Sequence, residues 1–533
     1  MRAEHKESVR SEVTARVVGR YCSEGQAAVQ EIMTDALFHE RTRLEKSRYP
    51  GEEKDVAFWK NAARTLGNSS PAGERELLQQ TTLRFVNEVM GHFDPKVYRM
   101  STKIMPTALG VLLNSLDPRR ALKNPKLLNL NENIIIKGES EAARRMASLG
   151  TVVVVPTHLS NLDSIVMGYA AFLMGLPPLT YGAGLNLFNN RLIGYFMSNL
   201  GAYRVDRRKK CALYKEVLKE YATYSIELGY HNLFFPGGTR IRSGEVETKL
   251  KKGLLGTGLR AYMNNISAGR PKPNVYIVPC TISYALVLEA KTLIEDHLKE
   301  AGKSRYIISD DEFSRVKRIA EFMRELMALN SRIYLTFGQP LDPFGNRVDF
   351  QGRSIDARGR EIDITRYVAK DGTVYEDPQR DRQYTTELSR SIVTSFTKDN
   401  RLQSTNIVAF TVFQMMRNEQ PGSDLYRVLR SGHSPAGFPV GHVAAGVDAV
   451  LTELRAMVER NEIHLDPDLD GRDAASVLKH ALRTFASYHH TRAVKREGER
   501  IHGAAPELVY YYHNRAAGYG LERLVGPAVA AVV

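Results

Sequence analysis

The sequence predicts an α/β domain with a mainly parallel sheet, set between helical N-terminal and C-terminal regions. Short, continuously apolar runs separated by helical segments indicate the central domain, because parallel strands are usually buried on both faces. The predicted strands are 133–136, 151–155, 232–235, 275–278 and 333–337, and the main helices between them are 139–148, 211–228 and 315–329. Charged stretches with apolar residues three and four positions apart predict helices on both sides of this domain.

These changes of pattern divide the 533 residues into four parts. We expect an N-terminal helical domain at 1–130, the α/β domain at 131–345, an inserted polar hairpin or loop at 346–380 and a helical C-terminal region at 381–533. The apolar stripe at 97–116 favours a buried helix, with a helix in a membrane interface as the alternative.

Composition and charge narrow the class of protein. Lys and Arg number 74 against 60 Asp and Glu, and the formal net charge of +14 favours phospholipid headgroups, phosphorylated metabolites or nucleic acid as partners. The three cysteines, Cys22, Cys211 and Cys280, are too far apart for a disulfide framework or a metal motif. No segment reaches the roughly 18–20 apolar residues that cross a bilayer. We therefore expect a cytoplasmic protein that is soluble or peripheral on a membrane and binds no metal.

Several common functional motifs are missing from the sequence. It contains no GxxxxGK[ST] phosphate loop, no HExxH metal motif and no GxSxG nucleophile motif. Residues 256–261 fit a loose GxGxxA pattern, but no predicted strand precedes them, which disfavours dinucleotide binding. The lack of an RNA-binding signature or zinc finger disfavours nucleic acid as the partner.

A histidine and an aspartate follow one of the buried strands. His158 comes directly after the strand at 151–155, and Asp163 lies five residues further on, where a helix is expected to begin. Sites in open α/β sheets lie at the carboxyl ends of strands. An aspartate bonded to one imidazole nitrogen leaves the other nitrogen able to accept a proton, as in a general base. Such spacing also arises by chance in a chain with 14 histidines, so the pair alone does not establish a catalytic site.

Two basic segments are candidates for binding an anion. Residues 234–244 follow a predicted strand and place two glycines beside Arg240 and Arg242. Glycines let backbone N–H groups approach an anion, and Arg offers a forked donor that matches phosphate. For the second segment, 207–210, a solvated helix face is the favoured interpretation of Arg208 to Lys210. Lys249, Lys251 and Lys252 extend the positive charge.

Four segments in order resemble the four blocks of the glycerolipid acyltransferase family. The family blocks are HxxxxD, a GxxFxxR type, FPEGTRSR, and an apolar strand ending in proline. Here they read HLSNLD (158–163), GAYRVDR (201–207), FPGGTRIR (235–242) and IVPCTISY (277–284). The resemblance covers roughly 131–345 and implies an acyltransferase core for the α/β domain. Residues 183–184 and 251–255, with both helical regions, are similar to the long branch that acts on glycerol-3-phosphate or dihydroxyacetone phosphate.

The resemblance implies transfer of a fatty acyl group from acyl-CoA or acyl-ACP to the sn-1 hydroxyl of glycerol-3-phosphate, in phospholipid synthesis at the inner face of the cell membrane. His158, oriented by Asp163, would be the general base, and no cofactor would be needed. Thr239 or backbone N–H groups of the 237–238 turn would stabilise the oxyanion. The substrate-binding residues would be Arg207, Gly238, Thr239, Arg240, Arg242 and Lys251, with an anionic membrane surface as a further partner.

One position departs from the family pattern. Gly237 stands where the third block has glutamate. This departure leaves three alternatives open: lysophosphatidate as acceptor, dihydroxyacetone phosphate as acceptor, or a catalytically inactive homologue that binds membranes. The soluble plastid branch of glycerol-3-phosphate acyltransferases also lacks this glutamate, so its absence does not imply inactivity.

Overall fold

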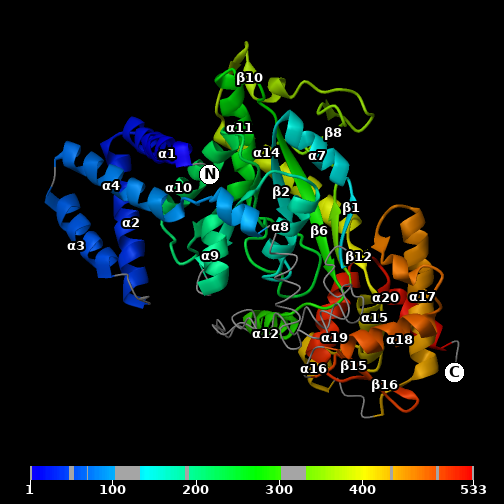
Figure 1. The fold of residues 1–533 in the computed structure, drawn as a ribbon. Coiled ribbons are helices and arrows are strands. Elements are labelled where there is room, and N and C mark those ends of the chain that lie inside the picture. The colour runs from blue at the N-terminus through cyan, green and yellow to red at the C-terminus, as the bar shows by residue number, and fades with distance from the viewer. Residues whose placement is uncertain are drawn as a thin grey trace.

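The computed structural model describes residues 3–46, 53–68, 70–101, 133–185, 191–301, 332–431, 436–487 and 491–530 (Figure 1). The predicted helix at 315–329 and most of the apolar stripe at 97–116 lie outside these residues. Among the residues that are described, no helix is both long enough and apolar enough to span a bilayer.

The N-terminal region is helical, as predicted. Its helices are α1 (Ala3–Ser23), α2 (Gln26–Lys46), α3 (Glu53–Asn68) and α4 (Pro71–Val89), drawn in blue in Figure 1. Ser70 caps α4 by accepting a hydrogen bond from the N–H of Gly73, and Pro71 occupies the first turn, where its missing N–H costs nothing. Trp59 and Phe85 from these helices share one apolar core with Tyr221 of α10 (Ala212–Glu227), so the helices pack directly on the α/β domain.

The central sheet has seven strands in the order β1-β7-β6-β2-β5-β3-β4. Neighbouring strands are parallel except β6 and β7, which confirms the mainly parallel sheet. The strands are β1 (Ile134–Gly138), β2 (Thr151–Pro156), β3 (Thr180–Gly184), β4 (Ala202–Val205), β5 (Asn232–Leu233), β6 (Val275–Tyr284) and β7 (Ile333–Phe337).

Two of these strands were not predicted from the sequence. β3 reads TYGAG and β4 has only four residues, so neither has the apolar run or the clean alternation of a strand. Pairing creates them: β3 lies between β4 and β5, with Tyr181 opposite both Ala202 and Leu233. The strand β6 is longer than predicted because its second half continues past β2 and pairs with β7.

Helices cover both faces of the sheet. On β2, Val152 and Val154 face one core, which α7 (Ser140–Leu149) and α8 (Asp163–Leu173) also enter. Val153 and Val155 face the other core with α11 (Lys252–Ser267) and α14 (Pro378–Lys398). A strand buried on both faces needs an unbroken apolar run, which is why β2 was predictable. The remaining helices of this domain are α9 (Arg191–Asn199) and α12 (Ala290–Ala301).

Residues 346–380 contain short paired strands. β8 (Arg347–Val348) pairs with β9 (Ser354–Ile355), and β10 (Ala369–Lys370) pairs with β11 (Thr373–Val374), both antiparallel. The short helix η5 (Ile364–Tyr367) lies between the two pairs. The domain boundaries themselves stay predictions.

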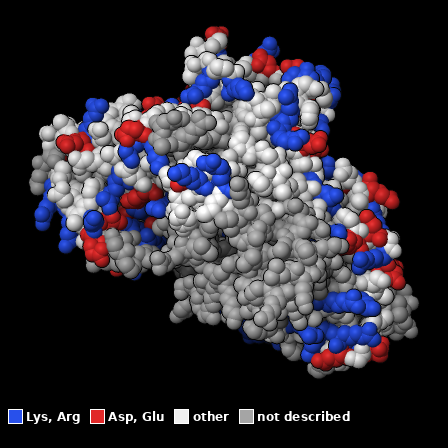
Figure 2. Space-filling view, in the orientation of Figure 1, with Lys and Arg blue, Asp and Glu red and all other residues white. Residues whose placement is uncertain are grey.

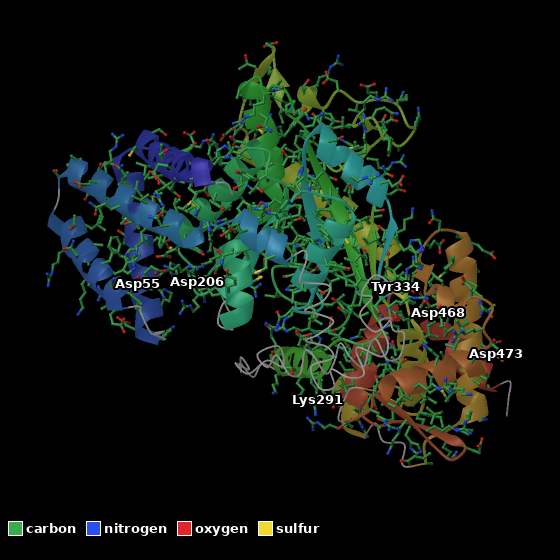
Figure 3. The ribbon with its side chains drawn as sticks, in the orientation of Figure 1. Asp55, Asp206, Lys291, Tyr334, Asp468 and Asp473 are labelled. Carbon is green, nitrogen blue, oxygen red and sulfur yellow. The ribbon has the colours of Figure 1, made fainter. Side chains whose placement is uncertain are left out.

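The C-terminal region is mainly helical and shares a core with the sheet. Tyr334 of β7 donates a hydrogen bond of 2.7 Å to Asp466, and Arg332 pairs with Asp468 at 2.9 Å, in the region labelled in Figure 3. Its helices are α15 (Ser404–Asn418), α16 (Leu425–Ser431), α17 (Val440–Glu459), α18 (Ala474–Phe485), α19 (Pro506–His513), α20 (Glu522–Ala530), η6 (Pro467–Leu469) and η7 (Asn514–Ala516). Short strands join them: β12 (Arg401–Leu402), β13 (Phe438–Pro439), β14 (His464–Leu465), β15 (Val494–Glu497) and β16 (Arg500–Gly503).

The basic run at 208–210 is not a solvated helix face, which corrects the favoured interpretation. Lys209 is buried and forms ion pairs with Glu40 at 3.0 Å and Glu88 at 2.9 Å. Burial opposes its charge, but the two carboxylates outweigh that effect and raise the pKa of Lys209. Arg208 pairs with Asp206, labelled beside the N-terminal helices in Figure 3. Lys209 therefore joins α2 and α4 to the loop after β4.

We predict that Lys209→Ala destabilises the packing of the N-terminal helices by up to about 3 kcal/mol, because the buried Glu40 and the partly exposed Glu88 lose their shared cation. Trp59 is the single tryptophan of the chain and is 1% exposed within this core, so its fluorescence reports urea unfolding of these helices. The exposed neighbour Lys210 is the matched control. Equal unfolding midpoints for Lys209→Ala and Lys210→Ala would contradict the structural role.

Candidate active site

The first and third sequence blocks meet at the carboxyl ends of two neighbouring parallel strands. His158 lies in the loop between β2 and α8, and residues 234–251 form the loop between β5 and α11. The N–H of Ile241 donates a hydrogen bond of 2.7 Å to the carbonyl of His158, so the two loops are joined directly. This is the position at which an open α/β sheet binds its ligand.

His158 and Asp163 form the hydrogen-bonded pair that the sequence predicted. Nδ1 of His158 lies 2.9 Å from Oδ2 of the fully buried Asp163. The same oxygen accepts the backbone N–H groups of Leu159 at 2.7 Å and Ser160 at 2.9 Å. The imidazole also stacks on Phe235 of the third block, with ring centroids 4.0 Å apart. These contacts hold the ring from two sides and leave Nε2 as the nitrogen outside the Asp163 bond.

The surroundings of His158 keep its imidazole neutral at neutral pH. Burial lowers the pKa of His158 below its ordinary value of 6.5, and the positive charges of Arg240 and Arg207 add to that effect. The hydrogen bond to Asp163 raises the pKa of His158, but the pKa stays below the ordinary value. With Nδ1–H donating to the carboxylate, Nε2 carries a lone pair, so the geometry supplies a proton acceptor.

Tyr284 is a site residue that sequence reasoning did not single out. Its hydroxyl donates a hydrogen bond of 2.6 Å to the second oxygen of Asp163, Oδ1. Burial beside this carboxylate raises the pKa of Tyr284 well above its ordinary value, so the phenol stays protonated and donates. Tyr284 is the last residue of the fourth block and of β6. No local sequence pattern indicates that its hydroxyl contacts Asp163.

Glu289 is a second site residue that was missed. It is fully buried and accepts hydrogen bonds from the hydroxyl of Ser160 at 2.7 Å and the N–H of Asn161 at 3.0 Å. Arg240 of the third block pairs with it at 3.2 Å. Glu289 thus links the first block to the third. Its sequence signal was a single acidic residue within the apolar run 285–290.

The three predicted phosphate-binding arginines lie in one positive region. Desolvation, together with the charges of Arg240 and Arg242, lowers the pKa of Arg207, so the three guanidinium groups influence one another. Arg242 forms an ion pair with the exposed Glu300 of α12. Arg207 has an exposed side chain. Repulsion among neighbouring cations is relieved by a bound anion, which favours this region as an anion site.

Gly238, Thr239 and Lys251 also come together. Gly238 has φ of +76°, which favours glycine, and its N–H donates to the carbonyl of Phe235 at 3.0 Å. That N–H is therefore engaged within the turn rather than aimed at an oxyanion. The side chain of Lys251 crosses the glycine so closely that a Cβ on Gly238 would lie 2.7 Å from its Cδ. Thr239 follows in the same turn and is half-buried.

Comparison with known proteins agrees with this geometry. The family described as Acyltransferase matches residues 134–283. A protein named glycerol-3-phosphate acyltransferase from Actinobacillus succinogenes is 30% identical over 204 residues, 38% of this chain. Its namesake from Pseudoalteromonas translucida is 25% identical over 264 residues, 49% of this chain.

Residues 134–283 therefore resemble an acyltransferase domain, and the chain is similar to proteins named glycerol-3-phosphate acyltransferase. The matched range, 134–283, holds the first three blocks and nearly all of the fourth. The alignments cover 28% and 23% of the two relatives, so the chain spans about a quarter of their length.

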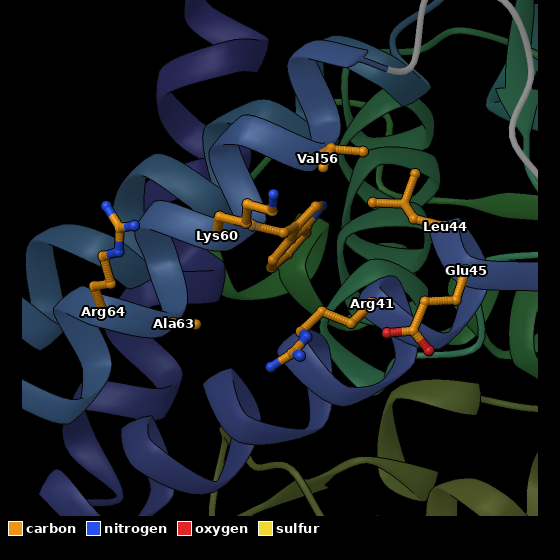
Figure 4. Close-up of a pocket in the computed structure, with 8 residues that line it drawn as sticks. Arg41, Leu44, Glu45, Val56, Lys60, Ala63 and Arg64 are labelled. Carbon is orange, nitrogen blue, oxygen red and sulfur yellow. The ribbon is translucent and has the colours of Figure 1, made fainter.

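Another hollow of the protein lies between α2 and α3 (Figure 4). It contains Trp59 and is lined by Arg41, Leu44, Glu45, Val56, Lys60, Ala63 and Arg64. None of these residues belongs to the four blocks, so this hollow is separate from the site at the sheet edge.

We predict that Tyr284→Phe destabilises the protein by about 1–3 kcal/mol, because a buried oxygen of Asp163 loses its donor. Chemical denaturation followed by circular dichroism measures the change. Tyr375→Phe is the matched control, since Tyr375 is 44% exposed. If both variants unfolded at the wild-type denaturant concentration, the Tyr284 hydroxyl would not contribute to holding Asp163.

Proposed function

We propose that this protein is an O-acyltransferase that moves a fatty acyl group from acyl-CoA or acyl-ACP to the sn-1 hydroxyl of glycerol-3-phosphate. The observation that carries the proposal is the neutral His158 imidazole, bonded to Asp163 through Nδ1 and lying beside a cluster of arginines. The relatives named glycerol-3-phosphate acyltransferase support the choice of acceptor.

The proposed reaction is a direct transfer between two bound substrates. Nε2 of His158 takes the proton of the acceptor hydroxyl as its oxygen attacks the thioester carbonyl. The tetrahedral intermediate collapses to the new ester, the C–S bond breaks, and the thiolate leaves with the proton returned by the imidazolium. The buried Asp163 carboxylate stabilises that imidazolium and keeps the ring in position. The reaction needs no cofactor, metal or covalent enzyme intermediate.

The acceptor phosphate is assigned to the positive region beside His158. Arg207 is exposed there, and Arg240 forms an ion pair with Glu289. Arg242 and Lys251 add positive charge, and Thr239 is the side chain proposed to stabilise the oxyanion. Clamping the phosphate brings the hydroxyl to Nε2, and such positioning supplies much of the rate enhancement of a bimolecular transfer.

Attachment to an anionic membrane surface is part of the proposal. Phe172 and Leu173, at the end of the helix that Asp163 begins, are 41% and 39% exposed, and Tyr195 on α9 is 50% exposed. Apolar side chains of this size at the surface suit lipid contact or an acyl chain. On the face in Figure 2, Lys and Arg are interspersed with Asp and Glu, and the net charge of +14 favours attraction to anionic lipid.

We predict that His158→Ala lowers acyl transfer by about 10²- to 10⁴-fold, the range expected on loss of a general base. Wild type and variant are assayed with glycerol-3-phosphate, dihydroxyacetone phosphate and lysophosphatidate, each with acyl-CoA and acyl-ACP. Because the pKa of His158 is lowered, wild-type activity should be level above pH 6.5 and fall only in more acidic buffer. His442→Ala, a half-buried histidine on α17, is the control.

Near-normal transfer by His158→Ala would rule out this mechanism. Preference for lysophosphatidate or dihydroxyacetone phosphate would reassign the acceptor. Lipid binding without turnover on any acceptor would support the inactive homologue instead.

We predict that the protein floats with liposomes containing anionic lipid and that Phe172→Ser with Leu173→Ser reduces the bound fraction severalfold. Full burial of a large apolar side chain contributes about 1.5–3 kcal/mol, and these two, 41% and 39% exposed, would each contribute a part of that. Phe350→Ser, at a residue 54% exposed in the 346–380 segment, is the matched control. If wild type, the double variant and Phe350→Ser floated equally, Phe172 and Leu173 would not be part of the membrane contact.

A further inference from the structure

The glycine that departs from the family pattern is packed against a carboxyl group. A Cβ placed on Gly237 would overlap Oε1 of Glu247 and lie 2.6 Å from its Cδ. Gly237 is not among the glycines with positive φ, so its backbone accepts any residue. The Glu247 side chain is therefore what excludes a side chain at position 237.

Glu247 lies in an unusual place for an acidic residue. It is 7% exposed, and its Oε2 has no hydrogen-bond partner among the described residues. Its carboxyl lies beside the backbone N–H of His158 and near the charge of Arg515. Burial raises the pKa of Glu247 to about 8, although Arg515 opposes the shift. Burying a carboxyl oxygen without a hydrogen-bond partner is costly.

The C-terminal region holds Glu247 in this place. Arg515 donates to the carbonyls of Ile282 at 3.1 Å and Glu245 at 3.3 Å, and Asn514 donates to the carbonyl of Ser243 at 2.8 Å. The loop leading into Glu247 is thus bonded to η7, more than 250 residues further along the chain. These bonds anchor the backbone that leads into Glu247 and limit how far the residue can shift from Gly237.

We propose that Glu247 is a positioning residue that supplies, from outside the third block, the carboxyl group that Gly237 lacks. It fills the side-chain space at position 237 and holds the turn of Gly237 and Gly238 against the backbone of His158. The role rests on the proposed acyl transfer, since it concerns the alignment of His158 with the acceptor loop. The departure at Gly237 is then a relocation of the carboxyl group within the same site rather than its loss.

The two positions share one space, so exchanging their side chains tests the proposal. Four variants are compared: Glu247→Ala, Gly237→Glu, the double variant Gly237→Glu with Glu247→Ala, and the control double variant Gly237→Glu with Glu245→Ala. Glu245 is an exposed acidic residue two positions away, so its removal vacates no space at Gly237. Acyl transfer and thermal unfolding are measured for each, with kcat and KM for the acceptor determined separately.

We expect each single variant to lose about 10- to 100-fold in kcat, because a small displacement of a catalytic loop has an effect of that size. The exchange variant should recover at least tenfold over Gly237→Glu, whereas the Glu245→Ala control should recover nothing. Glu247→Gln should stay close to wild type at neutral pH, because a carboxyl group with a pKa of about 8 is mostly uncharged there and glutamine keeps its shape. Recovery that is equal in both double variants, or an active Gly237→Glu, would overturn the proposal.

Thermal unfolding separates this proposal from the proposed function. If wild type transfers no acyl group, the function is wrong, but the shared space is still tested by stability. Gly237→Glu should then lower the unfolding temperature, and Glu247→Ala should restore it in the double variant while Glu245→Ala does not. If the change in unfolding temperature of the Gly237→Glu, Glu247→Ala double variant equalled the sum of the two single changes, the positioning role would be overturned. This outcome does not depend on activity.

Discussion

The buried carboxylate of Asp163 is the constraint on which the site depends. Removing a carboxylate from water is costly unless donors replace the water. Here the His158 ring, two backbone N–H groups and the Tyr284 hydroxyl do so. These donors come from the loop after β2 and from the end of β6, so satisfying one charge fixes the relation between the first and fourth blocks. The imidazole is oriented as a consequence of this arrangement.

Two further buried carboxyl groups extend the arrangement. Glu289 joins the first block to Arg240 of the third, and Glu247 fills the space beside Gly237. Arg515 and Asn514 of the C-terminal region bind the loop that carries Glu247. The C-terminal helices therefore contribute to the site through the loop they hold, although the matched family range ends at residue 283. Their packing on the sheet is part of what aligns the third block.

The parts that were predicted correctly share a physical feature: each depends on neighbours in the sequence. β2 and β7 are unbroken apolar runs because both of their faces are buried. His158 and Asp163 are five residues apart, so one loop and one helical turn suffice to join them. The strands β3 and β4 escaped prediction because their residues favour a strand only when a neighbouring strand pairs with them. The prediction that Lys209 lies on a solvated helix face was wrong, because a run of positive charge does not show which carboxylates the folded chain brings into contact with it.

The sequence by itself determined the α/β class, the four ordered blocks and the His158–Asp163 pair, since periodicity and short spacing are local properties. Only the tertiary structure decided which distant groups complete the site. Tyr284 and Glu289 are hydrogen-bonded to the first block, from which they lie more than 120 residues away in the sequence. Arg515 donates to the loop that carries Glu247 across 270 residues. Contacts of that kind are set by strand order and helix packing, which no local pattern specifies. For the same reason Gly237 alone indicated a missing carboxyl group, whereas the folded chain places one in its space.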